Sequence, residues 1–211
     1  MWSVPFSVWR LMFAYALMMG GTALTVLIAG IIGTRFAPSP GLATLPIALA
    51  VIGVACSTLP TGRLQARFGR RTVFLGYGAL AIGSALMAAA SLVAGSFAVY
   101  CLSAFVMGWA AAAGHQYRFA ALELVPAPQA AQATSVLLLG GIVGAFVGPE
   151  MAVRGRHLLP TEYAGSYLLL VGGYMAALVL VAFYREAEPE PSNVHEGGPP
   201  LGEILREPVV V

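Results

Sequence analysis

Four arginines lie close together in the segment 62–71 of this chain, at positions 63, 67, 70 and 71. The segment begins at Gly62 and contains a second glycine, Gly69, and it lies between two long apolar runs. Each run is long enough to cross the hydrocarbon core of a bilayer as a helix. Short arginine-rich loops between spans stay on the cytoplasmic side of a membrane. The cluster is too short and too enclosed to indicate nucleic-acid binding.

A second group of polar residues ends a later apolar run: His115, Gln116, Tyr117 and Arg118, followed by Glu123. Charged groups at membrane depth are costly and usually line a cavity or find a partner. Arg118 is therefore a candidate gate residue paired with Glu123 or with a helix end, or an interfacial arginine that reaches lipid headgroups. The side chains of His115, Gln116 and Tyr117 either contact a substrate or bond one helix to another.

Glu150 follows Pro149 near the end of the fifth apolar run. It either titrates in a proton-coupled cycle or lies at the wet interface near Arg154. Pro149 is expected to kink or end its helix, because proline lacks the backbone N–H.

Three methionines, Met12, Met18 and Met19, lie in the first apolar run, and their thioethers suit copper(I). No pair of Met, His or Cys occurs at helical spacing in the spans, so deformable packing is the alternative role. Met19 is kept as a candidate for substrate contact, and the metal site is left open. Cys56 and Cys101 both lie within apolar runs, which argues against a structural disulfide. We expect no cofactor.

The composition is that of an integral membrane protein. The chain has 211 residues, of which 59% are hydrophobic and 9% charged, and its mean hydropathy is +0.83. Soluble domains carry about 25% charged residues. No hydrolytic triad, phosphate-binding loop or zinc-ligand spacing is visible, so the sequence does not indicate an enzyme.

Six spans fit the apolar pattern, and all are predicted to be helices. Their approximate ranges are 9–33, 42–60, 72–94, 97–118, 131–152 and 164–184. The predicted organisation is a six-helix bundle over 1–185, a flexible cytoplasmic linker over 186–206, and the start of a truncated seventh span over 207–211. The linker is predicted from its glutamates, prolines and glycines.

The arginines also predict an orientation. With the segment 62–71 inside, eight arginines are cytoplasmic and three are outside. The cytoplasmic set is Arg10, Arg63, Arg67, Arg70, Arg71, Arg118, Arg185 and Arg206, and the outer set is Arg35, Arg154 and Arg156. This distribution follows the positive-inside rule and places both termini in the cytoplasm.

Gly140, Gly144 and Gly148 form a ridge of small residues on the fifth span. Such spacing lets helices pack closely in lipid. The ridge is either a generic packing surface or a surface against which a neighbouring helix slides or rocks.

Six spans, a basic loop between the second and third, and a long linker together resemble the N-terminal half of a major facilitator superfamily transporter. The matching positions of the family's gating loop are Gly62, Leu64, Arg67, Gly69, Arg70 and Arg71. The loop departs from the family at Ala66, where most members carry an aspartate of a charge network. That part of the gating is therefore not carried over.

The stretch Tyr117-Arg118-Phe119-Ala120-Ala121 is similar to a signature at the end of the fourth span in one bacterial subgroup. Some members of that subgroup resemble copper importers that supply cytochrome oxidase assembly. This second resemblance makes copper a candidate substrate.

The superfamily resemblance implies an all-helical membrane fold built as two inverted three-helix repeats. It implies a half or truncated secondary transporter in the bacterial inner membrane. Such a chain would move a small solute or metal ion by alternating access, with a second half or a copy of itself as partner. The alternatives are a non-transporting membrane assembly factor and an inactive remnant. No nucleic-acid partner is expected.

Overall fold

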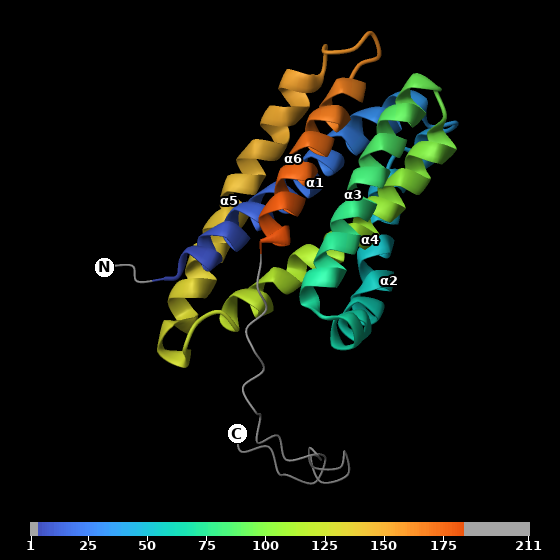
Figure 1. Cartoon of the computed structure of the whole chain (residues 1–211). Coiled ribbons are helices and arrows are strands. Elements are labelled where there is room, and N and C mark those ends of the chain that lie inside the picture. The colour runs from blue at the N-terminus through green and yellow to red at the C-terminus, as the bar shows by residue number, and fades with distance from the viewer. Residues whose placement is uncertain (1–3, 184–211) are drawn as a thin grey trace, which may run out of the picture.

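The computed structural model describes residues 4–183, and this range holds six long helices (Figure 1). They are α1 (Phe6–Phe36), α2 (Leu45–Phe68), α3 (Arg70–Val93), α4 (Phe97–Leu122), α5 (Ala130–Gly155) and α6 (Ala164–Ala182). Two single-turn 3-10 helices, η1 (Pro40–Leu42) and η2 (Ala127–Gln129), precede α2 and α5. All six long helices are long and apolar enough to span a membrane, which confirms the expected all-helical membrane fold. The predicted linker and seventh span lie outside the described residues.

α2 is longer than the sequence suggested, because it continues through Pro60 to Phe68. Hydroxyl groups around the proline bond to backbone carbonyls of the same helix: Thr58 Oγ1 donates to Val54 O at 2.8 Å, and Thr61 Oγ1 to Ser57 O at 2.6 Å. Pro60 removes only the backbone bond to the carbonyl of Cys56, and α2 continues on both sides of it. The prediction that Pro60 ends this span was therefore wrong.

The basic segment is consequently helical over most of its length rather than a loop. Gly69 is the single residue between α2 and α3. Its φ of 80° is readily adopted only by glycine. The chain thus reverses direction at one residue, with Arg67 in the last turn of α2 and Arg70 in the first turn of α3.

α5 likewise passes through Pro149 and ends only at Gly155. Of the two outcomes expected for Pro149, a kink or a helix end, the second is wrong. The short link expected at Gly95 and Ser96 is present, because α3 ends at Val93 and α4 begins at Phe97. Ser96 caps α4, accepting a hydrogen bond from the Val99 amide.

The helices pack in a pattern that repeats when α1–α3 are exchanged for α4–α6. α1 packs mainly against α5, and α4 correspondingly packs against α2. α3 packs against α4, and α6 correspondingly packs against α1, while α3 and α6 contact each other. In Figure 1, α5 and α6 lie on the left and α2 and α3 on the right, while α1 and α4 run diagonally across the view. This exchange symmetry is the arrangement expected of two inverted three-helix repeats.

Glycines form the two seams that join the repeats. In the α1–α5 seam, a Cβ on Gly144 would lie 2.9 Å from the Gly20 nitrogen, and a Cβ on Gly140 would lie 2.6 Å from Met12 O. In the α2–α4 seam, Gly53 and Gly108 each face the backbone of the opposite helix. Without a hydrophobic drive between helices in lipid, close backbone approach supplies the packing energy. The glycine ridge on α5 is thus a packed surface.

Hydroxyl groups in the core hydrogen-bond inside the bundle. The Tyr100 and Tyr167 hydroxyls lie 2.7 Å apart, joining α4 to α6. Met107 Sδ accepts from Ser84 Oγ at 3.3 Å and from Tyr174 Oη at 3.1 Å. Lipid offers no partner for a polar group, so such bonds form between helices.

The bundle has two distinct ends. The arginine-rich end comprises the start of α1, the α2–α3 and α4–α5 turns and the end of α6. The opposite end comprises the α1–α2, α3–α4 and α5–α6 connections. α2 and α5 carry many exposed apolar side chains, including Leu59 and Phe146, each 75% exposed. These two helices are the least covered by the rest of the bundle.

Candidate functional site

A groove about 90 Å³ in volume opens between α1, α2 and α4. Its walls are almost entirely apolar. The lining residues are Thr22, Thr25 and Val26 of α1, Ile47, Ala50, Val51 and Val54 of α2, and Met107, Gly108 and Ala111 of α4. Thr22 and Met107 lie near the middle of their helices, so the groove lies near the middle of the bundle's height.

α4 is held between the two other helices by its glycines. Gly114 faces Met19 of α1, since an added Cβ would lie 3.0 Å from Met19 Cε. Gly108 faces Ala50 of α2. The surface of α4 between these two contacts therefore faces the groove, and Ala111 lies on it.

His115 and Arg118 lie on this same surface of α4. They follow Ala111 by four and seven residues, a spacing that keeps side chains on one helix face. Both are exposed, and both lie between the groove and the arginine-rich end. No ion pair within residues 4–183 includes Arg118. Two of the four consecutive polar residues in this stretch thus share one surface.

The other two lie elsewhere on the helix. Tyr117 is 2% exposed, and its ring contacts those of Phe74 and Tyr15, with centroids 4.5 Å and 6.3 Å apart. Tyr117 is thus a core residue between α1, α3 and α4. Gln116 is half-buried and is two residues from Arg118 in sequence, so it lies on a different side of the helix.

Glu123 pairs with Arg70 and not with Arg118. Arg70 Nη2 lies 2.6 Å from Glu123 Oε1. The pair ties the first turn of α3 to the residue after α4. The candidate pairing of Arg118 with Glu123 is therefore wrong, because the one-residue turn at Gly69 places Arg70 closer.

The rest of the arginine cluster divides into two kinds. Arg71 Nη2 donates to Ala182 O at 2.6 Å, where it neutralises the carbonyl end of α6. Arg63 and Arg67 are exposed on the last turns of α2. Ala66, at the position where the family carries aspartate, is also exposed.

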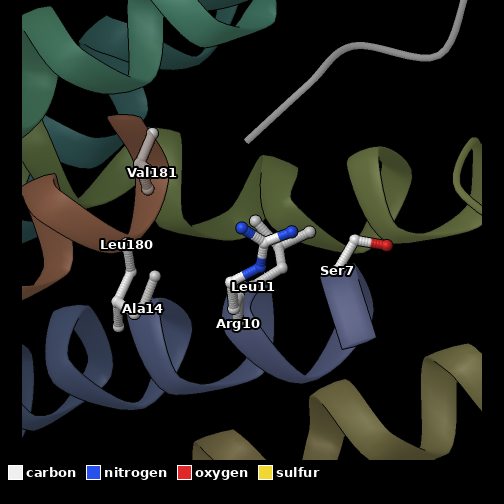
Figure 2. Close-up of a pocket in the computed structure, with 6 residues that line it drawn as sticks. All are labelled: Ser7, Arg10, Leu11, Ala14, Leu180 and Val181. Carbon is white, nitrogen blue, oxygen red and sulfur yellow. The ribbon is translucent and has the colours of Figure 1, made fainter. Parts of the chain in front are cut away.

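Arg10 also reaches the end of α6, donating from Nη1 to Phe183 O at 3.4 Å. It borders a pocket of about 10 Å³ between α1 and α6. Figure 2 shows Ser7, Arg10, Leu11 and Ala14 of α1 on one side of this pocket and Leu180 and Val181 of α6 on the other. A pocket of this size holds about one water molecule, so it is not a solute site.

Charged groups at the opposite end form two sets. Glu150 Oε1 lies 2.6 Å from Arg154 Nε, and both side chains are more than half exposed. This geometry matches the interfacial role and gives no support to a buried proton carrier. Glu162 bridges Arg35 and Arg156, and the hydrogen bonds from Arg35 and then Arg156 hold its pKa below the usual glutamate value.

The candidate metal ligands do not converge. Residues 4–183 hold no group of three or more His, Cys, Asp or Glu side chains that could hold a metal ion. Met12 contacts Gly140 and Met19 lies between Gly114 and Gly144, so both methionines fill helix seams. Packing accounts for their positions.

Thr22 and Thr25 are the groove residues that sequence reasoning missed. Thr25 is 5% exposed, and its Oγ1 has no partner within hydrogen-bonding distance. A threonine three residues from another in an apolar span was the available signal. The sequence alone could not place these two threonines at the groove, because their position depends on how α1 packs against α2 and α4.

Comparison with known proteins identifies relatives for most of the chain. The sequence profile described as Major Facilitator Superfamily matches residues 11–211. The chain is 33% identical over 198 residues to the riboflavin transporter RfnT of Brucella anthropi, covering 92% of this chain and 50% of that protein. It is 29% identical over 174 residues to the uncharacterized MFS-type transporter YdeG of Bacillus subtilis, and 25% identical over 176 residues to YddS of the same organism.

The chain covers 50% of RfnT and 40% of both YdeG and YddS, so it spans about half the length of these curated relatives or somewhat less. None of the three names refers to a metal. The copper-importing subgroup expected from the Tyr-Arg-Phe-Ala-Ala stretch therefore gains no support.

Proposed function

Since this chain belongs to the major facilitator superfamily, a family of membrane transporters rather than enzymes, we propose that it forms one six-helix half of a secondary transporter. The transporter moves a small organic solute across a bacterial inner membrane. The observation that carries the proposal is the groove between α1, α2 and α4. It lies near the middle of the bundle, where transporters with repeat architecture bind their solutes.

Transport in this proposal needs a second bundle opposite the groove. A single bundle offers one wall of a cavity, and alternating access requires two walls that rock about a fixed site. The exposed apolar faces of α2 and α5 would contact the second bundle at the edges of the cavity. The second bundle is supplied by further chain, by a separate chain or by a copy of this one.

Riboflavin or a closely similar flavin is the substrate we propose. The proposal is supported by the name of the relative that shares 33% identity over 92% of this chain. The apolar walls of the groove and its two threonine hydroxyls also suit a flat heteroaromatic ring better than a small ion. At about 90 Å³ the groove is smaller than a typical ligand pocket of ~300 Å³ or more, so the second bundle would complete the site.

The orientation follows the arginines. We place the arginine-rich end, with Arg63, Arg67 and Arg118, in the cytoplasm, and the α5–α6 connection outside. In this orientation α1 begins and α6 ends on the cytoplasmic side.

Reconstitution into liposomes tests this function. The chain is incorporated alone and together with a six-helix second half from a relative such as RfnT, and riboflavin uptake is measured by its fluorescence inside the vesicles. We expect uptake only with the second half present.

We further expect Arg118→Ala to reduce uptake strongly, while Arg154→Ala, at an exposed ion pair of the opposite end, leaves it near the wild-type level. Uptake by a strictly monomeric chain, or uptake indifferent to Arg118, would contradict the proposal.

A further inference from the structure

We infer that the groove is a two-part flavin site. The apolar part between α1, α2 and α4 receives the flat ring system, and the strip formed by His115 and Arg118 receives the hydroxylated or phosphorylated side chain. The inference rests on the proposed function, because it divides the proposed substrate between two places on the same surface.

The apolar part has the lining that a flat ring requires, and its volume of about 90 Å³ seats part of the ring system, while the opposing bundle of the proposed transporter would cover the rest. Gly108 and Ala111 present little side-chain bulk on α4, while Val26 and Val51 form the facing walls. No charged residue lines this part of the groove. Burial of a flat aromatic ring is favoured by such apolar surface.

One buried polar atom in this part can serve a heteroatom of the ring. The Thr25 side chain is 5% exposed and lines the groove, and its hydroxyl has no partner within hydrogen-bonding distance. Its polar neighbour is the hydroxyl of Tyr167, which is bonded to Tyr100 and makes only a weak contact with Thr25, outside good hydrogen-bond geometry. A ligand acceptor or donor at this position would give the Thr25 hydroxyl a better hydrogen bond than that contact.

The polar strip continues from the apolar part along α4. His115 and Arg118 follow Ala111 by about 6 Å and about 10 Å along the helix axis, at 1.5 Å per residue. The surface that holds them lies between the Gly114 contact to α1 and the Gly108 contact to α2, so it continues the groove and does not face away from it. A ligand that is apolar at one end and hydrophilic at the other matches this order.

Arg118 determines the chemistry of the strip. It is exposed and forms no ion pair within the described residues, so its guanidinium donors are available. A guanidinium presents five N–H donors, which suit several hydroxyls or a phosphate ester. Glu123, the nearest acidic residue along the chain, is already paired with Arg70 at 2.6 Å. The strip therefore favours polyol and phosphate groups over cationic ones.

The inference is tested by equilibrium binding to the full chain in lipid nanodiscs, followed by quenching of flavin fluorescence. Three probes separate the two parts: riboflavin, its terminal phosphate ester, and lumichrome, which has the ring without the polyol chain. Arg118→Gln should weaken the first two by about tenfold, the loss expected for a hydrogen bond from a charged donor, and leave lumichrome unchanged. The control is Arg154→Gln, which should change none of the three.

The apolar part is tested by adding bulk. Ala111→Phe should weaken all three probes equally, because each contains the ring. Ala111 is buried, so Val51→Trp provides a second variant: Val51 is 64% exposed and the added ring enters from the open side. Melting temperature and helical circular dichroism verify that each variant folds, and Ala145→Phe on the exposed face of α5 is the matched control.

Each outcome bears on a different statement. An equal loss of all three probes with Arg118→Gln, or no loss, would overturn the two-part division while leaving flavin binding in place. Retained lumichrome binding in Val51→Trp would overturn the position of the ring. Binding of none of the probes by the wild-type chain would overturn both this inference and the proposed substrate. Membership in the transporter family would be untouched.

Discussion

Arg70 and Glu123 illustrate how individual residues at the arginine-rich end acquire their partners. The pair depends on Gly69, whose positive φ lets α3 begin one residue after α2 ends. Arg70 is thereby placed beside the end of α4, while Arg118 lies on the surface of α4 that continues from the groove. Because Arg118 is five residues from Glu123 in sequence, it was the expected ion-pair partner of Glu123. In the folded chain the partner is Arg70.

Removing the charge of Glu123 should destabilise the bundle modestly. The Arg70 and Glu123 side chains are 25% and 45% exposed, so Glu123→Gln should cost no more than about 1 kcal/mol, the upper range for a solvent-screened pair. Melting in detergent at low and high salt is the measurement, and the loss should shrink as salt is added. Glu150→Gln, at a pair exposed by more than half on both sides, is the control. A larger effect for Glu150→Gln would contradict this ranking.

Glu162 should make the opposite end sensitive to acid. Its pKa is lowered by hydrogen bonds from Arg35 and Arg156, so the charged form is preferred in the folded protein. The stabilisation is fully present above the unfolded value of about 4.3 and is lost as the pH falls through the lower folded value. The difference in melting temperature between wild type and Glu162→Gln should therefore be largest near neutral pH and shrink progressively as the pH falls below about 4.3. A difference that persists unchanged in acid would show that the ion pairs do not stabilise this end.

At the scale of single helices, composition predicted which segments span and misjudged where they end. All six predicted spans are present because each carries a long apolar run. Pro60 was read as the end of the second span, yet it lies inside α2, which continues to Phe68. One lost backbone bond did not stop the helix, because the turns before and after Pro60 keep their own hydrogen bonds, and that outcome is visible only once the helix is built. For the same reason the arginine segment was expected as a loop and is instead mostly helix.

The glycine ridge on α5 is the element that sequence spacing predicted best, because helix periodicity alone puts Gly140, Gly144 and Gly148 on one face. The groove could not be found in this way. Its residues come from three helices, and only the packing of Gly108 against Ala50 and of Gly114 against Met19 fixes which side of α4 faces it. His115 and Arg118 were predicted as candidates without the knowledge that Tyr117, between them, lies in the core.

Adding bulk to the α1–α5 seam should disrupt the fold. A Cβ on Gly144 would already lie 2.9 Å from the Gly20 nitrogen and 3.0 Å from Met19 Cβ. Gly144→Leu should therefore destabilise the bundle by about 1–3 kcal/mol or more through overpacking. Ala145→Leu, one residue along on the exposed surface, is the control and should melt close to wild type. Equal melting temperatures and equal expression of the two variants would argue against a packed seam.

At the scale of the whole molecule, the exchange of α1–α3 with α4–α6 organises both packing and surface. It gives each repeat two helices in glycine seams with the other repeat, and it leaves α2 and α5 flanking α1 and α4. The groove and the Arg118 strip open on the α1 and α4 surface between these flanking helices. Because the six helices are long enough to span the membrane, the two ends of the bundle lie on opposite sides of it. The orientation of the bundle can therefore be measured directly.

Cysteine labelling in intact cells should report the orientation that we propose. The native thiols are first removed by Cys56→Ser and Cys101→Ala, since Cys56 is exposed. Single cysteines are then placed at Arg63, in the last turns of α2, and at His157, in the α5–α6 connection; both positions are exposed. A membrane-impermeant maleimide should label only His157→Cys, because arginine-rich short segments are retained in the cytoplasm. Arg63→Cys should become reactive once the cells are permeabilised, which verifies that its thiol is accessible.

Labelling of Arg63→Cys in sealed cells, with His157→Cys protected, would show that the orientation is the reverse of the one proposed. It would place the Arg118 strip at the outer mouth of the groove, so that the charged end of the site would meet the solute first from outside.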